Sequence, residues 1–194
     1  MAGRWWVSGL GIAGTLVACL YAPPAQASGQ WSLVGFTGVM TNNQWEQSII
    51  PWEVELLDSG LVGLGLRRDW PVGSAGRFRL GVEGQIVQHF GEQSHLEVNM
   101  PVVGSYLPQS GWLEPLDRFS FGLGLSYATD LPETELARDG ETQRVLIYWM
   151  GELGFDISTD TELLFRLHHR SDGFGLLDAN AGSNVLAVGL RRAF

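Results

Sequence analysis

The stretch RFSFGLGLSYA, residues 118–128, alternates between apolar side chains and small or polar ones. One face consists of small residues, Ser120, Gly122, Gly124 and Ser126. The apolar face consists of Phe119, Phe121, Leu123, Leu125 and Tyr127. Alternation with a period of two residues is typical of a β-strand with two unlike faces. The stretch therefore predicts a strand that separates an apolar environment from a polar one.

Seven further segments alternate in the same way, and turn-rich segments separate them. The eight predicted strands cover residues 30–39, 57–68, 76–89, 94–104, 117–128, 143–155, 161–171 and 183–194. Each is close in length to the roughly 9–11 residues that a tilted strand needs to cross a bilayer. An even number of two-faced antiparallel strands indicates an all-β fold, an eight-stranded antiparallel transmembrane β-barrel.

A soluble lipocalin-like barrel or a β-sandwich has the same periodicity, with its apolar face turned inward. Two features favour the membrane barrel. The polar face carries Gly, Ser, Arg and Glu, as expected of a narrow polar lumen in which Arg79 and Glu83 could neutralise each other. The last strand also ends on an aromatic residue, Phe194, which resembles the assembly signal of bacterial outer-membrane proteins.

The first 27 residues indicate the compartment. They contain one arginine, an apolar run and an Ala25-Gln26-Ala27 cleavage site, the three parts of a secretory signal peptide. We expect residues 1–27 to be this signal and residues 28–194 to form a single barrel domain in the outer membrane of a Gram-negative bacterium. Two alternatives remain: a membrane anchor helix, or a lipoprotein signal in which Cys19 is lipidated.

Composition restricts the function further. The chain of 194 residues has one cysteine, which excludes an intramolecular disulfide and a cysteine metal cluster. Its twelve basic residues are all arginine, and against twenty-one acidic residues they leave a formal charge of −9, so nucleic acid is not an expected partner. The long segments 40–56 and 129–142 are predicted outer loops that could contact lipopolysaccharide or a second copy of the chain, as in a homodimer.

The stretch ELLFRLHHRSDG, residues 162–173, contains the candidate catalytic residues. On the predicted strand, His169 and Ser171 continue the apolar, lipid-facing side, and Asn184 lies on the corresponding face of the last strand. The apolar residues before them on that face are Leu163, Phe165 and Leu167. A histidine beside a hydroxyl, with a third group to orient the imidazole, is the arrangement that activates a serine nucleophile. The plain alternative is a polar cluster that anchors a strand end at the membrane interface.

The segments HHRSDG (168–173), NAGSN (180–184) and LAVGLRRAF (186–194) resemble the C-terminal motif of the lipid A 3-O-deacylase family, also described as acyloxyacyl hydrolases. The resemblance implies an eight-stranded outer-membrane barrel with its active site on the lipid-facing exterior. It also implies that His169 is the base and Ser171 the nucleophile. The match is strongest over residues 163–194.

Two positions depart from the family pattern. The asparagine that follows the serine in the family is Asp172 here, although a backbone N–H from Asp172 or Gly173 could still serve an oxyanion hole. The acidic member of the triad falls on Asn184, which can orient a histidine but supplies no charge to an imidazolium. Asp178 is a candidate substitute from the loop, together with Asp172, and Asn180 fits the loop asparagine of the family.

These observations lead to one main expectation, a serine esterase that removes an ester-linked acyl chain from lipid A without cofactor or metal. The rival expectation is a barrel of the same family with a degraded triad and a structural or interaction role. Arg138, Arg144 and Arg170 near the outer rim could meet lipid A phosphates. His168 is expected to be an interior polar contact. His89 and His95 flank a predicted outer loop, and their spacing predicts no metal site.

Overall fold

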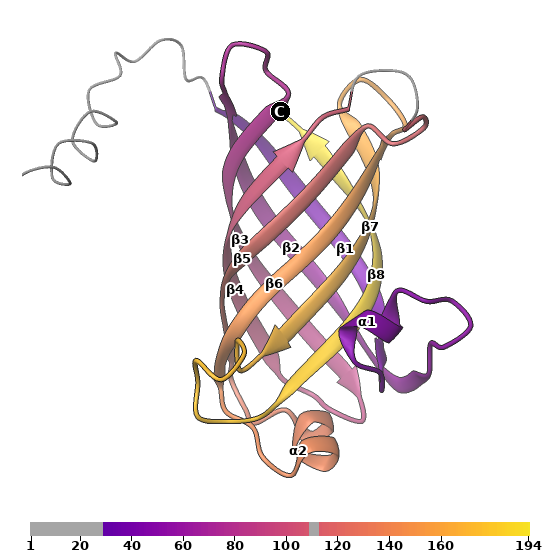
Figure 1. Cartoon of the computed structure of the whole chain (residues 1–194), viewed down its shortest axis with the longest axis vertical. Helices are drawn as coiled ribbons and strands as arrows, with labels where there is room; N and C mark the ends of the chain where they lie inside the picture. Colours follow the sequence, from indigo (N-terminus) through magenta and orange to yellow (C-terminus); the bar gives the residue numbers. More distant parts are fainter. Residues whose placement is uncertain (1–28, 109–112) are drawn as a thin grey trace, which may run out of the picture.

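The computed structural model describes residues 29–108 and 113–194, so the proposed signal peptide and Cys19 lie outside the described residues. The described chain forms a closed barrel in which every strand pairs antiparallel with its neighbours in sequence and β1 pairs with β8 (Figure 1). The strands are β1 (Gln30–Thr41), β2 (Leu56–Val72), β3 (Phe78–Gly91), β4 (Leu96–Tyr106), β5 (Arg118–Ala128), β6 (Val145–Asp156), β7 (Thr161–Ser171) and β8 (Gly182–Ala193). All eight predicted strands and the closed antiparallel barrel are confirmed.

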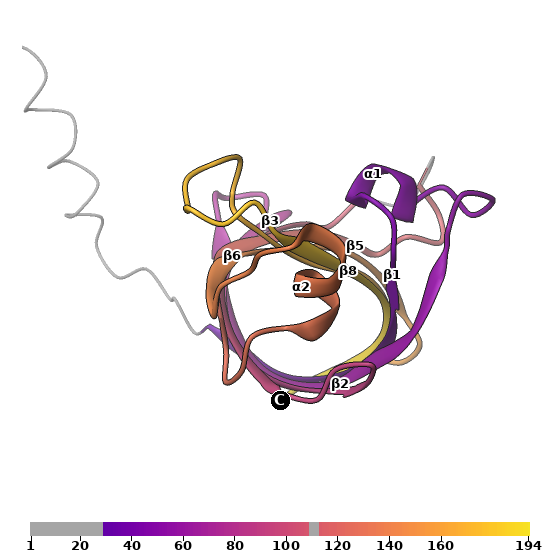
Figure 2. The ribbon, with the colours of Figure 1, turned by 90° about the horizontal axis from the view of Figure 1, so that it is seen from below.

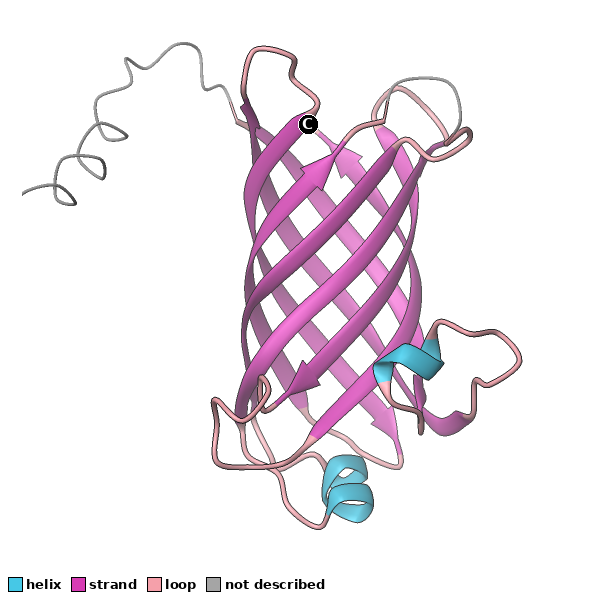
Figure 3. Cartoon of the chain, viewed as in Figure 1, coloured by secondary structure: helices cyan, strands magenta, loops and turns pink. Residues whose placement is uncertain are grey.

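The two ends of the barrel differ. One end, here called the loop end, carries the connections β1–β2, β3–β4, β5–β6 and β7–β8, and it also carries two short helices (Figure 3). These are α1 (Trp45–Ser48), which lies against the outside of the wall, and α2 (Glu133–Asp139), which lies across the barrel opening (Figure 2). The described segments contain no helix with the length and hydropathy needed to cross a bilayer.

The exterior of the barrel is a continuous apolar surface. Most of the residues that face outward are large hydrophobic side chains with high exposure. Examples from different strands are Leu64, Leu80, Ile86, Val102, Leu123 and Phe165. So large an exposed apolar area is unstable in water but matches a hydrocarbon surrounding, which identifies the outward face as lipid-facing.

The lumen is polar and filled by side chains. Arg166 is fully buried and binds Glu152 at 2.6 Å and Glu83 at 3.0 Å, and its guanidinium also lies 4.5 Å from the ring centroid of Phe36. Arg191 extends this network through a 2.7 Å bond to Glu152. Buried charges are tolerated only when paired, so the network neutralises the interior.

The predicted pair of Arg79 and Glu83 is wrong. Arg79 lies near the other end of the barrel, the end at which β1 begins, and binds the side chain of Gln30 at 3.1 Å. Glu83 is four residues farther along β3, where the closed wall brings Arg166 of β7 opposite it across the lumen. Periodicity assigned both residues to the correct face but carries no information about partners across a barrel.

Candidate active site on the lipid-facing surface

His169 and Asn184 are partners on neighbouring strands. Residue 169 of β7 pairs directly with residue 184 of β8, and His169 Nδ1 lies 2.6 Å from Asn184 Oδ1. Both side chains point outward, yet they are only 7% and 3% exposed. The chain therefore covers this part of its own outer wall, whereas the apolar positions farther along the same strands stay open.

The orientation of Asn184 fixes which ring nitrogen of His169 carries the proton. The Asn184 side-chain N–H₂ donates to the carbonyl oxygen of Asn43 at 2.8 Å, so its oxygen is the atom that faces the imidazole. An amide oxygen only accepts, so His169 must donate from Nδ1. The other ring nitrogen, Nε2, then carries the lone pair and is the atom able to accept a proton.

Two tryptophans hold the imidazole in place. The Trp149 ring on β6 lies 4.5 Å from the His169 ring between centroids, because residues 149 and 169 are also register partners. Trp45 of α1 packs edge-on against Trp149 at 5.6 Å and 84°. The β1–β2 connection thus contributes both Trp45 and Asn43 to the site.

Ser171 lies two residues farther along β7 toward the loop end, opposite Ile147 and Gly182. Its hydroxyl accepts a hydrogen bond from the Gly173 N–H at 3.3 Å. Among the described residues no hydrogen bond joins Ser171 to His169. Both nevertheless belong to the same face of β7, two residues apart.

Gly173 has a backbone requirement of its own. Its φ is +70°, and a Cβ there would lie 2.5 Å from Ile147 Cγ1. A side chain at this position would therefore be strained by the backbone and would also collide with β6. In this conformation the Gly173 N–H donates to the Ser171 hydroxyl.

The other loop residues singled out in the sequence lie elsewhere. The Asp172 N–H donates to the Ala181 carbonyl at 3.1 Å, so it is not free for the site, and the Asp172 carboxylate accepts from the Gly175 N–H at 2.9 Å within the loop. Asp178 is exposed, and Asn180 donates its N–H to Glu141 at 2.9 Å. In the described part of the chain none of the three hydrogen-bonds to His169.

Two charged residues of the short helices also lie at the site: Glu46, which the sequence analysis did not single out, and Arg138, which it named only as an arginine of the outer rim. Glu46 of α1 is close enough for its charge to act on His169. Arg138, at the end of α2, donates to the carbonyl of Gly182, which is the residue opposite Ser171, and its hydrogen bond to Asp139 raises the pKa of the guanidinium. Neither could be found from periodicity, because both lie on helices whose docking depends on the closed barrel.

Of the arginines expected at the outer rim, Arg170 is wrong. It is 1% exposed, faces the lumen and binds Glu135 of α2 at 3.3 Å. Arg138 remains a surface cation beside the site.

A large apolar groove adjoins these residues. It has a volume of about 1320 Å³ and runs along the outer wall beneath α1. Its lining includes Trp45, Ile49, Phe121, Trp149, Phe165 and Val188. Trp149 lines the groove and also contacts His169, so this tryptophan separates the groove from the imidazole, which is not itself part of the lining.

Comparison with known proteins extends the fold assignment. No protein-family model and no curated protein matches the sequence. Among solved structures, the outer membrane enzyme PagL is similar with a TM-score of 0.58 and 13% identity, over 83% of this chain and 98% of PagL. Neisserial surface protein A (NspA) is similar with a TM-score of 0.53 and 12% identity, over 87% of this chain and 99% of NspA. Together with the apolar exterior, these likenesses support an outer-membrane β-barrel.

Proposed function

We propose that the protein is an outer-membrane serine esterase that removes an ester-linked acyl chain from lipid A in the outer leaflet. The observation that carries the proposal is the 2.6 Å contact of His169 Nδ1 with Asn184 Oδ1 on the lipid-facing wall. A histidine on such a surface is costly unless it is used or paired. Here one ring nitrogen is engaged by Asn184, and the other is available as a base.

The chemistry follows from these residues. Ser171 Oγ attacks the ester carbonyl carbon while His169 Nε2 takes the hydroxyl proton. The resulting oxyanion accepts a hydrogen bond from the Gly173 N–H. This N–H becomes available when the serine hydroxyl turns from it toward the substrate. Collapse breaks the bond to the sugar oxygen, His169 returns the proton to that oxygen, and water then hydrolyses the acyl-serine through the same two groups.

The surroundings suit a large amphiphile. The groove of about 1320 Å³ accommodates acyl chains against its aromatic and aliphatic lining. Arg138 supplies a cation beside Ser171 for a phosphate of the lipid A head group. With the longer loops on the cell surface, as in bacterial outer-membrane barrels, the site lies at the level of the outer-leaflet head groups.

Two observations favour a second function. Position 184 holds an amide where a triad carries a carboxylate, and Ser171 bonds to Gly173 instead of His169 among the described residues. Both features fit a barrel without catalysis, whose polar cluster anchors α1 to the wall. In that case Ser171 and His169 contribute to the docking of the β1–β2 connection and to nothing else.

An assay on the purified barrel in detergent micelles separates the two functions. With lipid A as the substrate and fatty-acid release as the readout, Ser171→Ala should lower kcat by about a thousandfold or more. Ser126→Ala is the matched control, because Ser126 is fully buried in the lumen and its hydroxyl has no hydrogen-bond partner. Equal release by both variants and the wild type, or release by none of them, would favour the non-catalytic barrel.

A further inference from the structure

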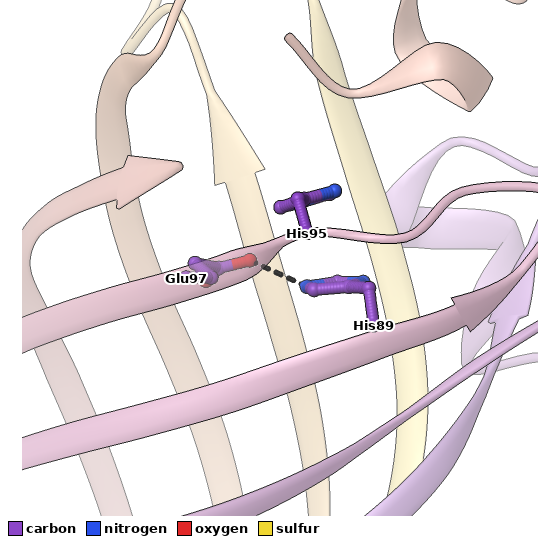
Figure 4. Close-up of side chains that lie close together, drawn as sticks. All are labelled: His89, His95 and Glu97. Atoms are coloured by element: carbon purple, nitrogen blue, oxygen red, sulfur yellow. Dashed lines mark hydrogen bonds and ion pairs between the residues drawn. The ribbon is translucent and has the colours of Figure 1, made fainter. Parts of the chain in front are cut away.

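A second cluster of titratable side chains lies inside the barrel at the loop end. His89 of β3, His95 just before β4, and Glu97 of β4 converge there (Figure 4). One nitrogen or oxygen from each lies within 4.8 Å of the others, and the side chains are 2%, 4% and 0% exposed in that order. The β3–β4 hairpin brings the two histidines together, since they stand on either side of its turn.

Glu97 is positioned by groups on both sides. Its Oε1 accepts from His168 Nε2 at 2.9 Å across the lumen, and its Oε2 lies 2.8 Å from His89 Nε2. His168 therefore holds the carboxylate through one oxygen and leaves the other directed at the two hairpin histidines. A carboxylate held in this way is typical of metal sites, in which outer groups orient the ligands.

His95 is the unexplained member of the cluster. Its ring stacks on that of His89, with 4.3 Å between centroids and 14° between planes. Its Nε2 is buried and has no hydrogen-bond partner among the described residues, which is a costly state for a polar atom. Burial lowers the pKa of His95 to about 4, and the neighbouring His89 is the second cause of this shift. The His95 ring is therefore uncharged at neutral pH, and its nitrogen can offer a lone pair to a metal ion.

We propose that His89, His95 and Glu97 form a binding site for a divalent transition-metal ion such as Zn²⁺. Two imidazoles and one carboxylate are a common donor set for Zn²⁺, with a fourth position left for water. Zinc lies about 2.0–2.1 Å from such ligands. The three ligand atoms already lie within 4.8 Å of one another. Side-chain rotations that move each atom by about an ångström bring them to this geometry.

The hydrogen bonds around His89 allow the required change of tautomer. At present His89 Nδ1 accepts from the Gln93 amide at 2.9 Å, and the Gln93 oxygen accepts from Thr134 of α2 at 2.7 Å. Metal binding through His89 Nε2 moves the ring proton to Nδ1. A rotation of the Gln93 amide then presents its oxygen to Nδ1–H and its nitrogen to the Thr134 hydroxyl, so His89 and Thr134 both keep a contact with Gln93, while the contact of the Gln93 nitrogen with Met40 Sδ at 3.0 Å is given up.

One positive charge opposes a cation at this position. Arg170 Nε lies 4.0 Å from Glu97 Oε2. Its guanidinium is also paired with Glu135 of α2 at 3.3 Å, which offsets the repulsion. The site thus combines two histidines, a carboxylate and a paired arginine, and Gln93 links it to Thr134 of α2, the helix that lies across the barrel opening (Figure 2).

The test uses the complete barrel without a polyhistidine tag, refolded in detergent after removal of metal by a chelator. Titration with Zn²⁺ by calorimetry, and with Co²⁺ by its visible absorption, should show one ion per chain. His95→Ala should weaken binding by at least about tenfold, because it removes a ligand whose Nε2 makes no other contact. Glu97→Gln, which preserves shape, should weaken binding in the same way.

His169→Ala is the matched control, because His169 lies on the outer wall and should leave one ion bound per chain. Heat-dependent gel mobility verifies that each variant is folded. Absence of stoichiometric binding by the wild type, or equal binding by His95→Ala, would overturn the proposal. The measurement involves neither Ser171 nor lipid A, so its outcome is independent of the proposed esterase.

Discussion

Asn184 Oδ1 lies 2.6 Å from His169 Nδ1, and the second hydrogen bond of Asn184, to the Asn43 carbonyl, leaves that oxygen no other orientation. The pair therefore separates two roles that a carboxylate would combine. The amide fixes the tautomer and the direction of the imidazole, but it adds no charge to stabilise an imidazolium. Geometry and charge can thus be tested one at a time at this position.

Removal of the orienting group should lower activity. Asn184→Ala frees the imidazole to rotate and change tautomer, so kcat should fall by about a hundredfold. Asn184→Asp keeps an oxygen toward His169 and adds charge, so its kcat should exceed that of the wild type. Initial rates of fatty-acid release from lipid A micelles at neutral pH measure both. Full activity in Asn184→Ala would show that this contact has no catalytic role.

The helix over the site should matter through one tryptophan. Trp45 supports Trp149, which in turn contacts His169, so Trp45→Ala should lower kcat/KM by about tenfold as the imidazole loses its fixed position. Trp52 is the control, because it belongs to the same connection but is 85% exposed, and Trp52→Ala should leave the rate unchanged. Equal losses in the two variants would mean that the connection acts as a whole.

The charge network in the lumen should dominate the stability of the barrel. Arg166→Met leaves Glu83 and Glu152 short of a buried partner and should lower the free energy of unfolding by about 3–5 kcal/mol. Arg192→Met removes an exposed contact with Asp160 and should have little effect. Urea unfolding in detergent, followed by tryptophan fluorescence, measures the two. A neutral Arg166→Met would show that the network is not required for stability.

Stability should also fall with acid because of His95. Its pKa is about 4 in the folded protein, below the ordinary value of 6.5. Between these values the unfolded chain takes up a proton that the folded chain does not, so the free energy of unfolding decreases as the pH falls from 6.5 to 4. The urea midpoint of the metal-free protein should drop through this window, and less so in His95→Gln. Identical pH profiles for the two proteins would contradict this origin.

The strands were predictable because the alternation of side chains along each strand reflects the two environments that its two faces contact. The alternation in residues 118–128 suffices to identify β5 and its two faces, whereas the assignment of the apolar face to lipid also needed the composition of the polar face and the terminal Phe194. His169 and Asn184 were predictable together for the same reason, since they lie on outward faces of consecutive antiparallel strands. Pairing along a β-hairpin is a local relationship.

Contacts across the lumen or through the loops were not predictable in this way. Glu83 meets Arg166 from the opposite wall, and neither sequence spacing nor periodicity relates the two. His89 and His95 do face each other across one hairpin, and Glu97 follows two residues later on the inward face. That spacing of His, His and Glu is the local signal that could have identified the cluster. The docking of α1 over His169 has no local signal.

The most direct test of the central claim is mass spectrometry of lipid A from Gram-negative cells that express the wild-type protein, Ser171→Ala or His169→Asn. The account predicts that lipid A loses the mass of one ester-linked acyl chain with the wild type and stays intact with either variant. All three proteins must be folded in the outer membrane, as judged by heat-dependent gel mobility. Unaltered lipid A with the folded wild type, or the same loss with Ser171→Ala, would contradict the account.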